Sequence, residues 1–328
     1  MTVTVENTPA IICPKCGSES SKCFGRHRNG LQRYRCLACR ATFTEDHAPS
    51  FRTEDYLKEK RGLAALRMLL EGCSVRSVER MTGIRRDTII DLLLIAGERC
   101  EKLMDRLVRD VPATEVQTDE IWGYCRKKEG HKRPDEYQDD TIGDVWTWVA
   151  LERNTKLILA FAVGRRTLEK AFELTFKLRR ATNPNVRFQL TSDGLRAYRT
   201  AVDEMLADRC DFAQLIKFYS MPQMNEIRYS PARMIEAMPV PMSGDPDPAR
   251  ICTSHVERQN LTMRMQIRRL TRLTNGFSKK LESHKAAIAL HVAYYNFCRL
   301  HGSIRVTPAM EAGIADHMWN LRELLDAA

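Results

Sequence analysis

Hydrophobic residues recur at helical spacing in two parts of the chain. In the first part, residues 50–110, the apolar repeat is interrupted at Gly72 and again at Gly83. We therefore predict three helices here, the second capped by Ser74 and the third running over 85–107. Short helices joined by tight, glycine-containing turns are typical of a helix-turn-helix, and a plain helical linker is the alternative.

Between the two helical parts, apolar residues alternate or cluster in short runs that are typical of strands. The predicted strands are 115–124, 144–151, 157–163, 186–190 and 212–218, and the predicted helices between the last three are 167–180 and 195–206. Three antiparallel strands followed by alternating helices and strands is the ribonuclease-H-like order. The pattern therefore predicts an α/β fold with a mixed sheet and flanking helices.

The second helical part follows a segment rich in Met and Pro, 219–249, which we interpret as an irregular insertion. After it we predict long helices over 254–273 and 277–299. The predicted divisions of the chain are 1–48, 49–111, 112–305 with the insertion inside it, and a helical C-terminal tail over 306–328.

Cysteines near the N-terminus have the spacing of a metal site. They form two pairs, Cys13-x₂-Cys16 and Cys36-x₂-Cys39. Two such pairs on tight turns can place four thiolates around one structural Zn²⁺, whose binding would fold residues 1–48 as a zinc ribbon. Unrelated thiols or disulfides are the alternative, and Cys23 and His27 are the other ligand sources nearby.

The balance of charge points to a polyanionic partner, because the formal net charge is +10 at pH 7 and the pI is near 9.1. Over residues 258–305 there are ten Lys or Arg residues and one acid, Glu282, which makes this stretch a natural phosphate binder. Arg264, Arg268 and Arg272 are spaced by four on the predicted helix. We expect them to follow one phosphate track, and a solvated basic face is the alternative.

The start of the third helix in the 49–111 region carries residues suited to DNA. Arg85, Arg86 and Thr88 lie there, where the second element of a helix-turn-helix enters the major groove. We therefore predict that these three residues contact base edges and phosphates.

The sequence shows neither a membrane span nor an export signal, so we expect a protein that remains in the cell. No stretch approaches the roughly 20 apolar residues that span a bilayer, and residues 1–10 lack a basic start followed by an apolar run. Eleven cysteines without an export signal indicate reduced thiols. We expect a cytoplasmic, nucleoid-associated bacterial protein with no membrane partner and no small-molecule substrate.

Carboxylates in three predicted elements are candidates for catalysis. They are Asp119 inside a strand, Asp193 at the end of another strand, and Glu257 at the start of a helix. Side chains alternate along a strand, so Asp119 and Glu120 should face opposite ways and only one should point into a site. An edge-strand surface residue, a turn or cap, and a capping box beginning at Ser254 are the respective alternatives.

Mg²⁺ is the cation that best fits three such carboxylates in a basic protein. It prefers oxygen ligands and is usually held by a few carboxylates together with substrate phosphates. Two such ions about 4 Å apart activate an attacking oxygen and stabilise the leaving one in phosphoryl transfer. The acids therefore predict a site that acts on phosphodiesters.

Several motifs resemble the DDE transposases of the insertion-sequence-one family. They are Asp119-Glu120-Ile121-Trp122-Gly123-Tyr124, Ser192-Asp193-Gly194, Val256-Glu257-Arg258-Gln259-Asn260-Leu261, Tyr295-Asn296-Phe297-Cys298-Arg299-Leu300-His301 and Thr307-Pro308-Ala309. A ribbon of CxxC pairs followed by a helix-turn-helix is also how that family begins. The similarity covers most of the chain, and the Glu-Arg-x-Asn-Leu helix is its most specific element.

The resemblance implies a mechanism and a set of roles. Asp119, Asp193 and Glu257 would bind two Mg²⁺ (or Mn²⁺) ions, and Asn260 and Arg264 would face the same substrate. The N-terminal regions would bind the terminal inverted repeats of an insertion sequence. Water would cleave the element's end, and the resulting 3′-OH would attack target DNA.

Pairing of two ends implies a homo-oligomer on double-stranded DNA. Two other classes of protein remain open from the residues themselves. One is a non-catalytic DNA-binding regulator. The other is a ribonuclease-H-like nuclease or resolvase that cuts without joining.

Overall fold

A computed structural model describes residues 11–26, 31–44, 51–220 and 234–328, with side chains from residue 55 onward in the third range. His27 and residues 221–233 of the predicted insertion lie outside this part of the chain. The chain divides into two compact units, Met1–Arg52 and Thr53–Ala328. We describe each unit by itself.

The first unit contains a small antiparallel sheet in the order β1-β2-β3. Its strands are β1 (Ser21–Arg26), β2 (Gln32–Cys36) and β3 (Thr42–Thr44). Tight turns before β1 and after β2 carry the two CxxC pairs, with Gly17 at a positive φ of 71° in the first turn. The only buried hydrophobic side chains described in this unit are Cys13 and Cys36, so apolar packing contributes little to its stability.

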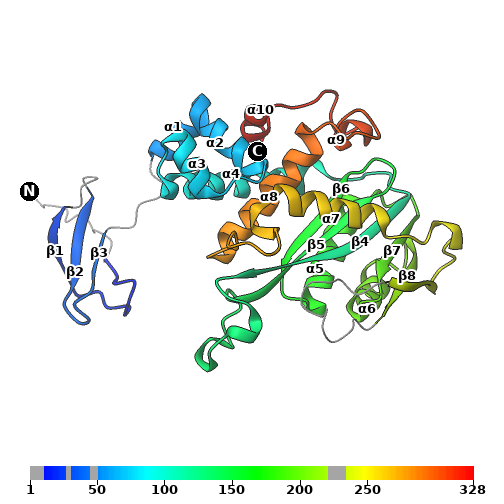
Figure 1. Cartoon of the computed structure of the whole chain (residues 1–328), viewed down its shortest axis with the longest axis horizontal. Helices are drawn as coiled ribbons and strands as arrows, with labels where there is room; N and C mark the ends of the chain where they lie inside the picture. The colour runs from blue at the N-terminus through cyan, green and yellow to red at the C-terminus, as the bar shows by residue number, and fades with distance from the viewer. Residues whose placement is uncertain (1–10, 27–30, 45–50, 221–233) are drawn as a thin grey trace, which may run out of the picture. The chain divides into compact units, whose positions relative to one another are not determined.

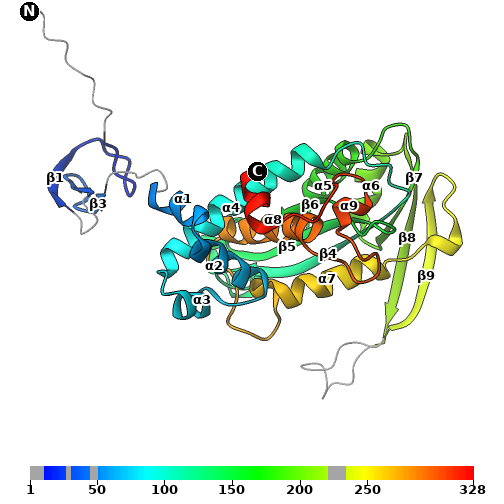
Figure 2. The same ribbon diagram turned by 90° about the horizontal axis from the view of Figure 1, so that it is seen from above.

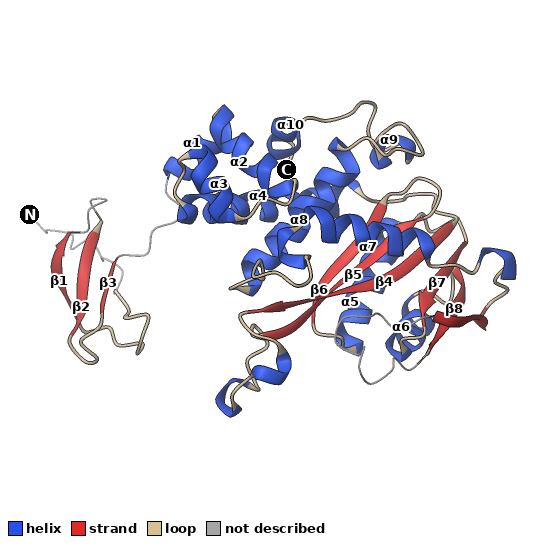
Figure 3. Ribbon diagram, in the orientation of Figure 1, coloured by secondary structure: helices blue, strands red, loops and turns tan. Residues whose placement is uncertain are grey.

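The second unit is built on a mixed six-stranded sheet in the order β6-β5-β4-β7-β8-β9 (Figure 3). The strands are β4 (Glu115–Cys125), β5 (Gly143–Glu152), β6 (Ile158–Gly164), β7 (Phe188–Asp193), β8 (Cys210–Tyr219) and β9 (Met234–Ser243). Strands β4, β5 and β6 pair antiparallel, whereas β7 is parallel to both β4 and β8. This is the ribonuclease-H-like order, so the predicted fold class is confirmed.

Strand β9 corrects the sequence prediction, because part of the supposed irregular insertion is a regular strand. It pairs antiparallel with β8 along its length, with Pro239 opposite Leu215 and Pro241 opposite Ala213. Proline cannot donate a ladder hydrogen bond and occurs in sheets mainly on edge strands. Figure 2 shows β9 at the outer edge of the sheet beside β8, where its prolines are tolerated but the strand signal in the sequence is weak.

Helices cover both faces of the sheet (Figure 1). One face carries α5 (Leu168–Ala181) and α6 (Arg196–Met205), and the other carries α7 (Ser254–Gln266) and α8 (Leu281–Cys298). Short 3₁₀ turns η1 (Glu129–His131), η2 (Pro134–Glu136), η3 (Pro248–Arg250) and η4 (Arg268–Leu270) lie in the connections, and α9 (Pro308–Glu311) and α10 (Leu321–Asp326) follow α8. A continuous apolar core fills both sides of the sheet.

The helical region before the sheet has the two predicted breaks and a further one at Glu59, so it contains four helices where three were predicted. Its helices are α1 (Phe51–Lys58), α2 (Lys60–Leu70), α3 (Val75–Thr82) and α4 (Arg86–Leu107). Ser74 caps α3 by accepting a hydrogen bond from the Ser77 backbone N–H at 3.1 Å. Gly83 ends α3 at a positive φ of 67°, a conformation that favours glycine. The separate helix-turn-helix domain stays a prediction.

Helix α4 packs along α8 in the interior of the second unit. At their crossing a side chain on Gly97 would lie 2.4 Å from the Ala286 Cα atom, so only glycine fits. The same core includes Leu92 and Leu103 of α4. The helical region and the sheet are therefore joined by packed side chains.

Helix α7 ends earlier than predicted. Its last helical residue is Gln266 rather than about Leu273. Arg268 lies in η4 and Arg272 lies beyond it. The expectation that Arg264, Arg268 and Arg272 form one stripe on a single helix is therefore wrong, and their predicted contact with DNA stays a prediction.

Candidate active site

An acidic cluster lies where β7 ends and β4 continues. The parallel pairing of β4 with β7 stops at Thr118 opposite Ser192, so the next residues on each strand extend past the paired region. These are Asp119, Glu120 and Asp193, and we call them the acidic cluster. Each offers a carboxylate oxygen within 4.8 Å of the others.

Glu120 joins this cluster although strand alternation predicts that it points away from Asp119. The Arg166 guanidinium bridges it to the cluster, with Nη2 at 2.9 Å from Glu120 Oε2 and at 3.2 Å from Asp193 Oδ2. Arg166 is held in turn over the Trp146 ring, 4.9 Å from its centroid. Because β7 ends at Asp193, side chains from both faces of the sheet converge around that strand end. The expectation that only one of the two β4 acids enters the site is wrong.

Helix α7 is fixed over the other face of β4 by a side-chain cap. The buried Gln117 Oε1 accepts hydrogen bonds from the backbone N–H groups of His255 at 3.0 Å and Val256 at 3.1 Å. These are first-turn donors that have no partner within the helix. One turn further on, Asn260 Nδ2 donates to Asp119 Oδ2 at 2.7 Å. The start of α7 is therefore placed directly beside the acidic cluster.

Glu257 reaches this region by a different contact. Its carboxylate pairs with Lys217 Nζ, from β8, and accepts a hydrogen bond from the Thr253 hydroxyl. Its side chain is 44% exposed, and Glu257 is not in the acidic cluster. The alternative role of Glu257 in a capping box beginning at Ser254 is excluded, because Thr253 is the N-cap residue and Ser254 is already helical.

Burial and mutual repulsion shift the protonation of the cluster. Burial, with the charges of Asp193 and Glu257 added, raises the pKa of Asp119 to about 6. Burial and the Asp193 charge raise the pKa of Glu120 to about 7, against the opposing effect of Arg166. Desolvated carboxylates that repel one another favour a cation between them. The all-oxygen donor set is of the type that Mg²⁺ and Mn²⁺ prefer.

Arg264 lies two turns beyond Glu257 on α7 and interacts electrostatically with Asp119. Burial lowers the pKa of its guanidinium, the Arg272 charge lowers it further, and Asp119 opposes both. Its buried Nη1 atom has no hydrogen-bond partner among the described residues. A cation held beside an acidic cluster in this way is available to an anionic substrate.

The N-terminal cysteines converge on one point. We call Cys13, Cys16, Cys36 and Cys39 the cysteine cluster, and their sulfurs all lie within 4.8 Å of one another. The Cys13–Cys39 and Cys16–Cys36 Sγ distances are 3.7 and 3.6 Å. Four sulfurs about 2.3 Å from one zinc ion in a tetrahedron are about 3.8 Å apart. The four residues are thus close enough to hold one metal ion, and Cys23 lies exposed outside the cluster.

The three residues predicted to contact DNA lie at the start of α4 and are at least partly exposed. Arg85 and Arg86 are exposed and Thr88 is half-buried. Asp87, in the first turn of α4, and Asp91 are also exposed, so acidic side chains lie beside the predicted DNA contacts. The role of these three residues in binding DNA stays a prediction.

Some of the residues that build the site were not identified from the sequence. Arg166, from the connection between β6 and α5, and Lys217, from β8, each pair with a carboxylate of the site that is far away in the sequence. Gln117 carries a readable signal, since an amide side chain on a buried strand two residues before Asp119 needs a partner. The two cations carry no such local signal.

The fold and the acidic cluster define a ribonuclease-H-like protein with a carboxylate site suited to a divalent cation. A family model described as IS1 transposase matches residues 248–298. That stretch contains η3, α7, η4 and α8, and therefore Glu257, Asn260 and Arg264. The predicted resemblance to the insertion-sequence-one transposases is confirmed there.

Other comparisons are weaker. No curated protein matches the chain. The solved structures of the Mos1 strand transfer complex and of the Mos1 transposase paired-end complex with left transposon end match 51% of this chain, at 15% and 14% identity and a TM-score of 0.19 for both. The match spans 60% of the length of those chains. Likeness at this level carries no weight for the site.

The described residues include no helix that is both long and apolar enough to cross a membrane.

Proposed function

We propose that this protein is a DDE-type DNA transposase that cleaves the ends of an insertion sequence and joins them to target DNA. The observation that carries the proposal is the convergence of Asp119 and Asp193, beside the family-matched helix α7, at one end of a ribonuclease-H-like sheet. Carboxyl ends of parallel strands are where ligands bind in open α/β sheets. The basic balance of the chain favours DNA as the ligand.

Asp119 and Asp193 would hold the divalent ions, with Glu257 as the third ligand. When bound, two Mg²⁺ or Mn²⁺ ions would supply activation of the attacking oxygen and stabilisation of the leaving oxygen. Asn260 orients Asp119 through its 2.7 Å hydrogen bond. Arg264, which interacts electrostatically with Asp119, would bind the phosphate that is cut.

The Glu257–Lys217 pair has a consequence for this proposal. Lys217 and Thr253 both contact Oε1 of Glu257, so Glu257 would become a ligand through Oε2 or by rotating away from Lys217. Released from Glu257, the Lys217 ammonium would lie beside the site, where it can contact a DNA phosphate. Glu120, held by Arg166 and buried, is the competing third carboxylate.

The remaining parts would position DNA. The cysteine cluster would bind one structural Zn²⁺ and fold a zinc ribbon. The helical region with Arg85, Arg86 and Thr88 would contact the terminal inverted repeats. Because two ends are joined in one event, we expect a homo-oligomer on double-stranded DNA.

Cleavage and joining of end DNA by the wild-type chain and the Asp119→Asn variant test the proposal. The substrate is a labelled duplex carrying the inverted repeat that flanks the gene, with a supercoiled plasmid as target and Mg²⁺ as cofactor. We expect joined product from the wild type and none from Asp119→Asn, with end binding retained by both.

Two other outcomes would replace the proposal. Cleavage without any joined product would identify a nuclease or resolvase. End binding by a wild-type chain that neither cuts nor joins would identify a DNA-binding regulator.

A further inference from the structure

A large basic cavity separates the helical region from the segment that follows α7. Its volume is about 870 Å³. One wall comes from α3 and α4, and the other from η4, the loop after it and α8. Cationic side chains line both walls: Arg76, Arg86, Arg268, Arg269, Lys279 and Lys280.

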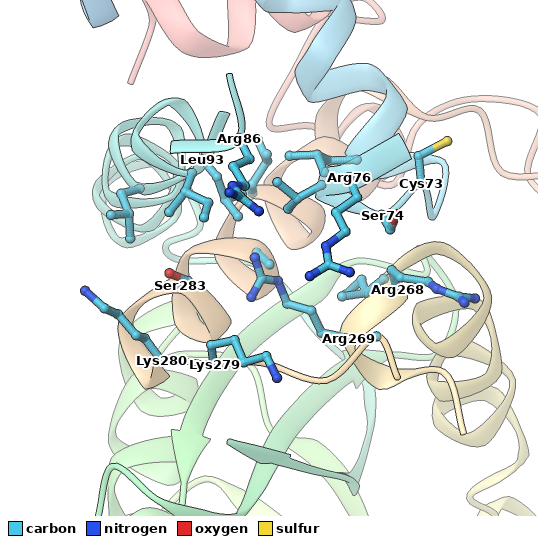
Figure 4. A pocket seen from close by; sticks show the side chains of 18 of the residues that line it. Cys73, Ser74, Arg76, Arg86, Leu93, Arg268, Arg269, Lys279, Lys280 and Ser283 are labelled. Atoms are coloured by element: carbon cyan, nitrogen blue, oxygen red, sulfur yellow. The ribbon is translucent and has the colours of Figure 1, made fainter. Parts of the chain in front are cut away.

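These cations are largely uncompensated. Among the described residues only Lys280 of the six has a carboxylate partner, Glu282 at 3.1 Å. The other acids that line the cavity are Asp87 and Asp91. Figure 4 shows Arg76 and Arg269 approaching each other from opposite walls. Like charges placed face to face are costly unless an anion lies between them.

A buried polar side chain at the same cavity has no hydrogen-bond partner in the part of the chain that the structure describes. His291 of α8 lines the cavity and is 1% exposed. Neither of its ring nitrogens has a hydrogen-bond partner among the described residues. Buried polar atoms are nearly always satisfied, so this histidine is a second, independent indication that a polar ligand enters the cavity.

Helix α7 connects the cavity to the acidic cluster. Asn260 contacts Asp119, and Gln266 at the end of the same helix lines the cavity. Six residues of helix span about 9 Å. Along one DNA strand, at about 3.4 Å per base pair, this corresponds to roughly three base pairs.

We propose that this cavity binds the sugar-phosphate backbone of the DNA duplex a few base pairs from the bond that is cut, so that the helical region and the segment from η4 to α8 hold one strand between them. The inference rests on the proposed function, which supplies DNA as the polyanion. It adds a subsite, Arg76, Arg269 and Lys279, that lies outside the carboxylate site.

Removal of two cavity cations tests this subsite. The variant is Arg76→Gln/Lys279→Gln, chosen because both side chains are exposed and their loss leaves the core intact. Binding of the end duplex is measured as a function of salt. Each lost phosphate contact lowers the slope of log K against log salt by about 0.9, so we expect a decrease of roughly 2 and about a tenfold or greater loss of affinity at low salt.

The matched control is Lys102→Gln/Arg180→Gln, which removes the same charge from exposed positions outside the cavity. We expect its salt slope to stay within about 0.5 of the wild type. Mn²⁺ binding at the acidic cluster and the melting temperature should be unchanged in both double variants. These two readouts confirm that the variants remain folded and that the carboxylate site is intact.

Three results would overturn the inference. A cavity variant with the wild-type salt slope would show that the cavity takes no phosphate of the duplex. An equal decrease in the control variant would show only loss of general charge. Competition by ATP or inorganic phosphate at the affinity of the duplex would assign the cavity to a free phosphate ligand. None of these measurements depends on catalysis. Failure of the cavity inference can therefore be told apart from failure of the proposed function, which a wild-type protein that binds ends without cutting them would show.

Discussion

The cysteine cluster and the acidic cluster both gather side chains that bind metal ions, but the chain builds them in different ways. The cysteine cluster lies within residues 13–39 on two turns of a small sheet. The acidic cluster joins residues 119 and 193 of two strands that are neighbours only in the folded sheet. Among the described residues of the first unit, only Cys13 and Cys36 are buried apolar side chains, whereas the acidic cluster rests on the large core of the second unit.

This difference indicates which cluster depends on its metal ion for folding. Structural zinc supplies folding free energy outright where a core is lacking. A catalytic carboxylate site instead uses the stability of its scaffold to hold like charges together. Metal removal should therefore unfold the first site and leave the second folded, with the repulsion among its carboxylates no longer offset.

The largest effect is expected at the cysteine cluster. Replacement of Cys13 by Ser should abolish zinc binding, with a loss on the order of 10 kcal/mol of folding free energy. Bound zinc and limited proteolysis of the full chain measure this, and cleavage should concentrate within the first unit. Cys23→Ser is the matched control, since Cys23 lies outside the cluster. Zinc retained by Cys13→Ser, or lost by Cys23→Ser, would contradict the assignment.

A large loss of activity without unfolding is expected at the acidic cluster. Asp193→Asn should lower end cleavage by about 10³-fold or more, because a ligand shared by the metal ions is lost. The control is Asp203→Asn, an exposed acid of α6. Rates are compared at saturating Mg²⁺, with end binding measured in parallel. Cleavage within a few fold of the wild type would exclude Asp193 from the chemistry.

Two variants decide whether Glu257 or Glu120 is the third metal ligand. We expect Glu257→Gln to lower cleavage by roughly 10²–10³-fold. Glu120→Gln should cost about tenfold or less, because its partner Arg166 also pairs with Asp193. Single-turnover cleavage by the two variants gives the comparison directly. The reverse order would make Glu120 the ligand and Glu257 the partner of Lys217.

The sequence alone predicted much of this arrangement where the signals were local. The CxxC spacing, the Ser74 cap and the Gly83 turn each depend on a few adjacent residues. The first five strands of the sheet followed from alternating or clustered apolar runs, whereas β9 was not predicted. The prediction for Glu120 was wrong because alternation holds for side chains inside a sheet. At the end of β7, side chains from both faces of the sheet can approach each other.

Contacts between residues far apart in the sequence could not be predicted from local sequence patterns. The prolines of β9 hide an edge strand, and the early end of α7 carries no breaker such as Gly or Pro at Ile267. The pairing of Lys217 with Glu257 requires β8 and α7 to be placed first. Asp119 and Asp193 lie together as expected, whereas the contacts that orient them join elements far apart in the chain.

The smallest effect is a pH dependence of stability in the metal-free protein. The pKa of Asp119 is raised to about 6 in the folded state, so the folded protein binds more protons than the unfolded chain between pH 4 and 6. Stability should rise by about 2 kcal/mol as pH falls from 7 to 4.5. Asp119→Asn should flatten this slope, as followed by chemical denaturation without divalent ions. A wild-type slope in the variant would assign the effect to other groups.

The central claim is that Asp119 and Asp193 together hold a divalent cation. Electron paramagnetic resonance of Mn²⁺ titrated into the wild type, Asp119→Asn, Asp193→Asn and the double variant tests it most directly. We predict that each single variant loses the site seen in the wild type and that the double variant loses no more. Unchanged Mn²⁺ affinity in either single variant would contradict the account.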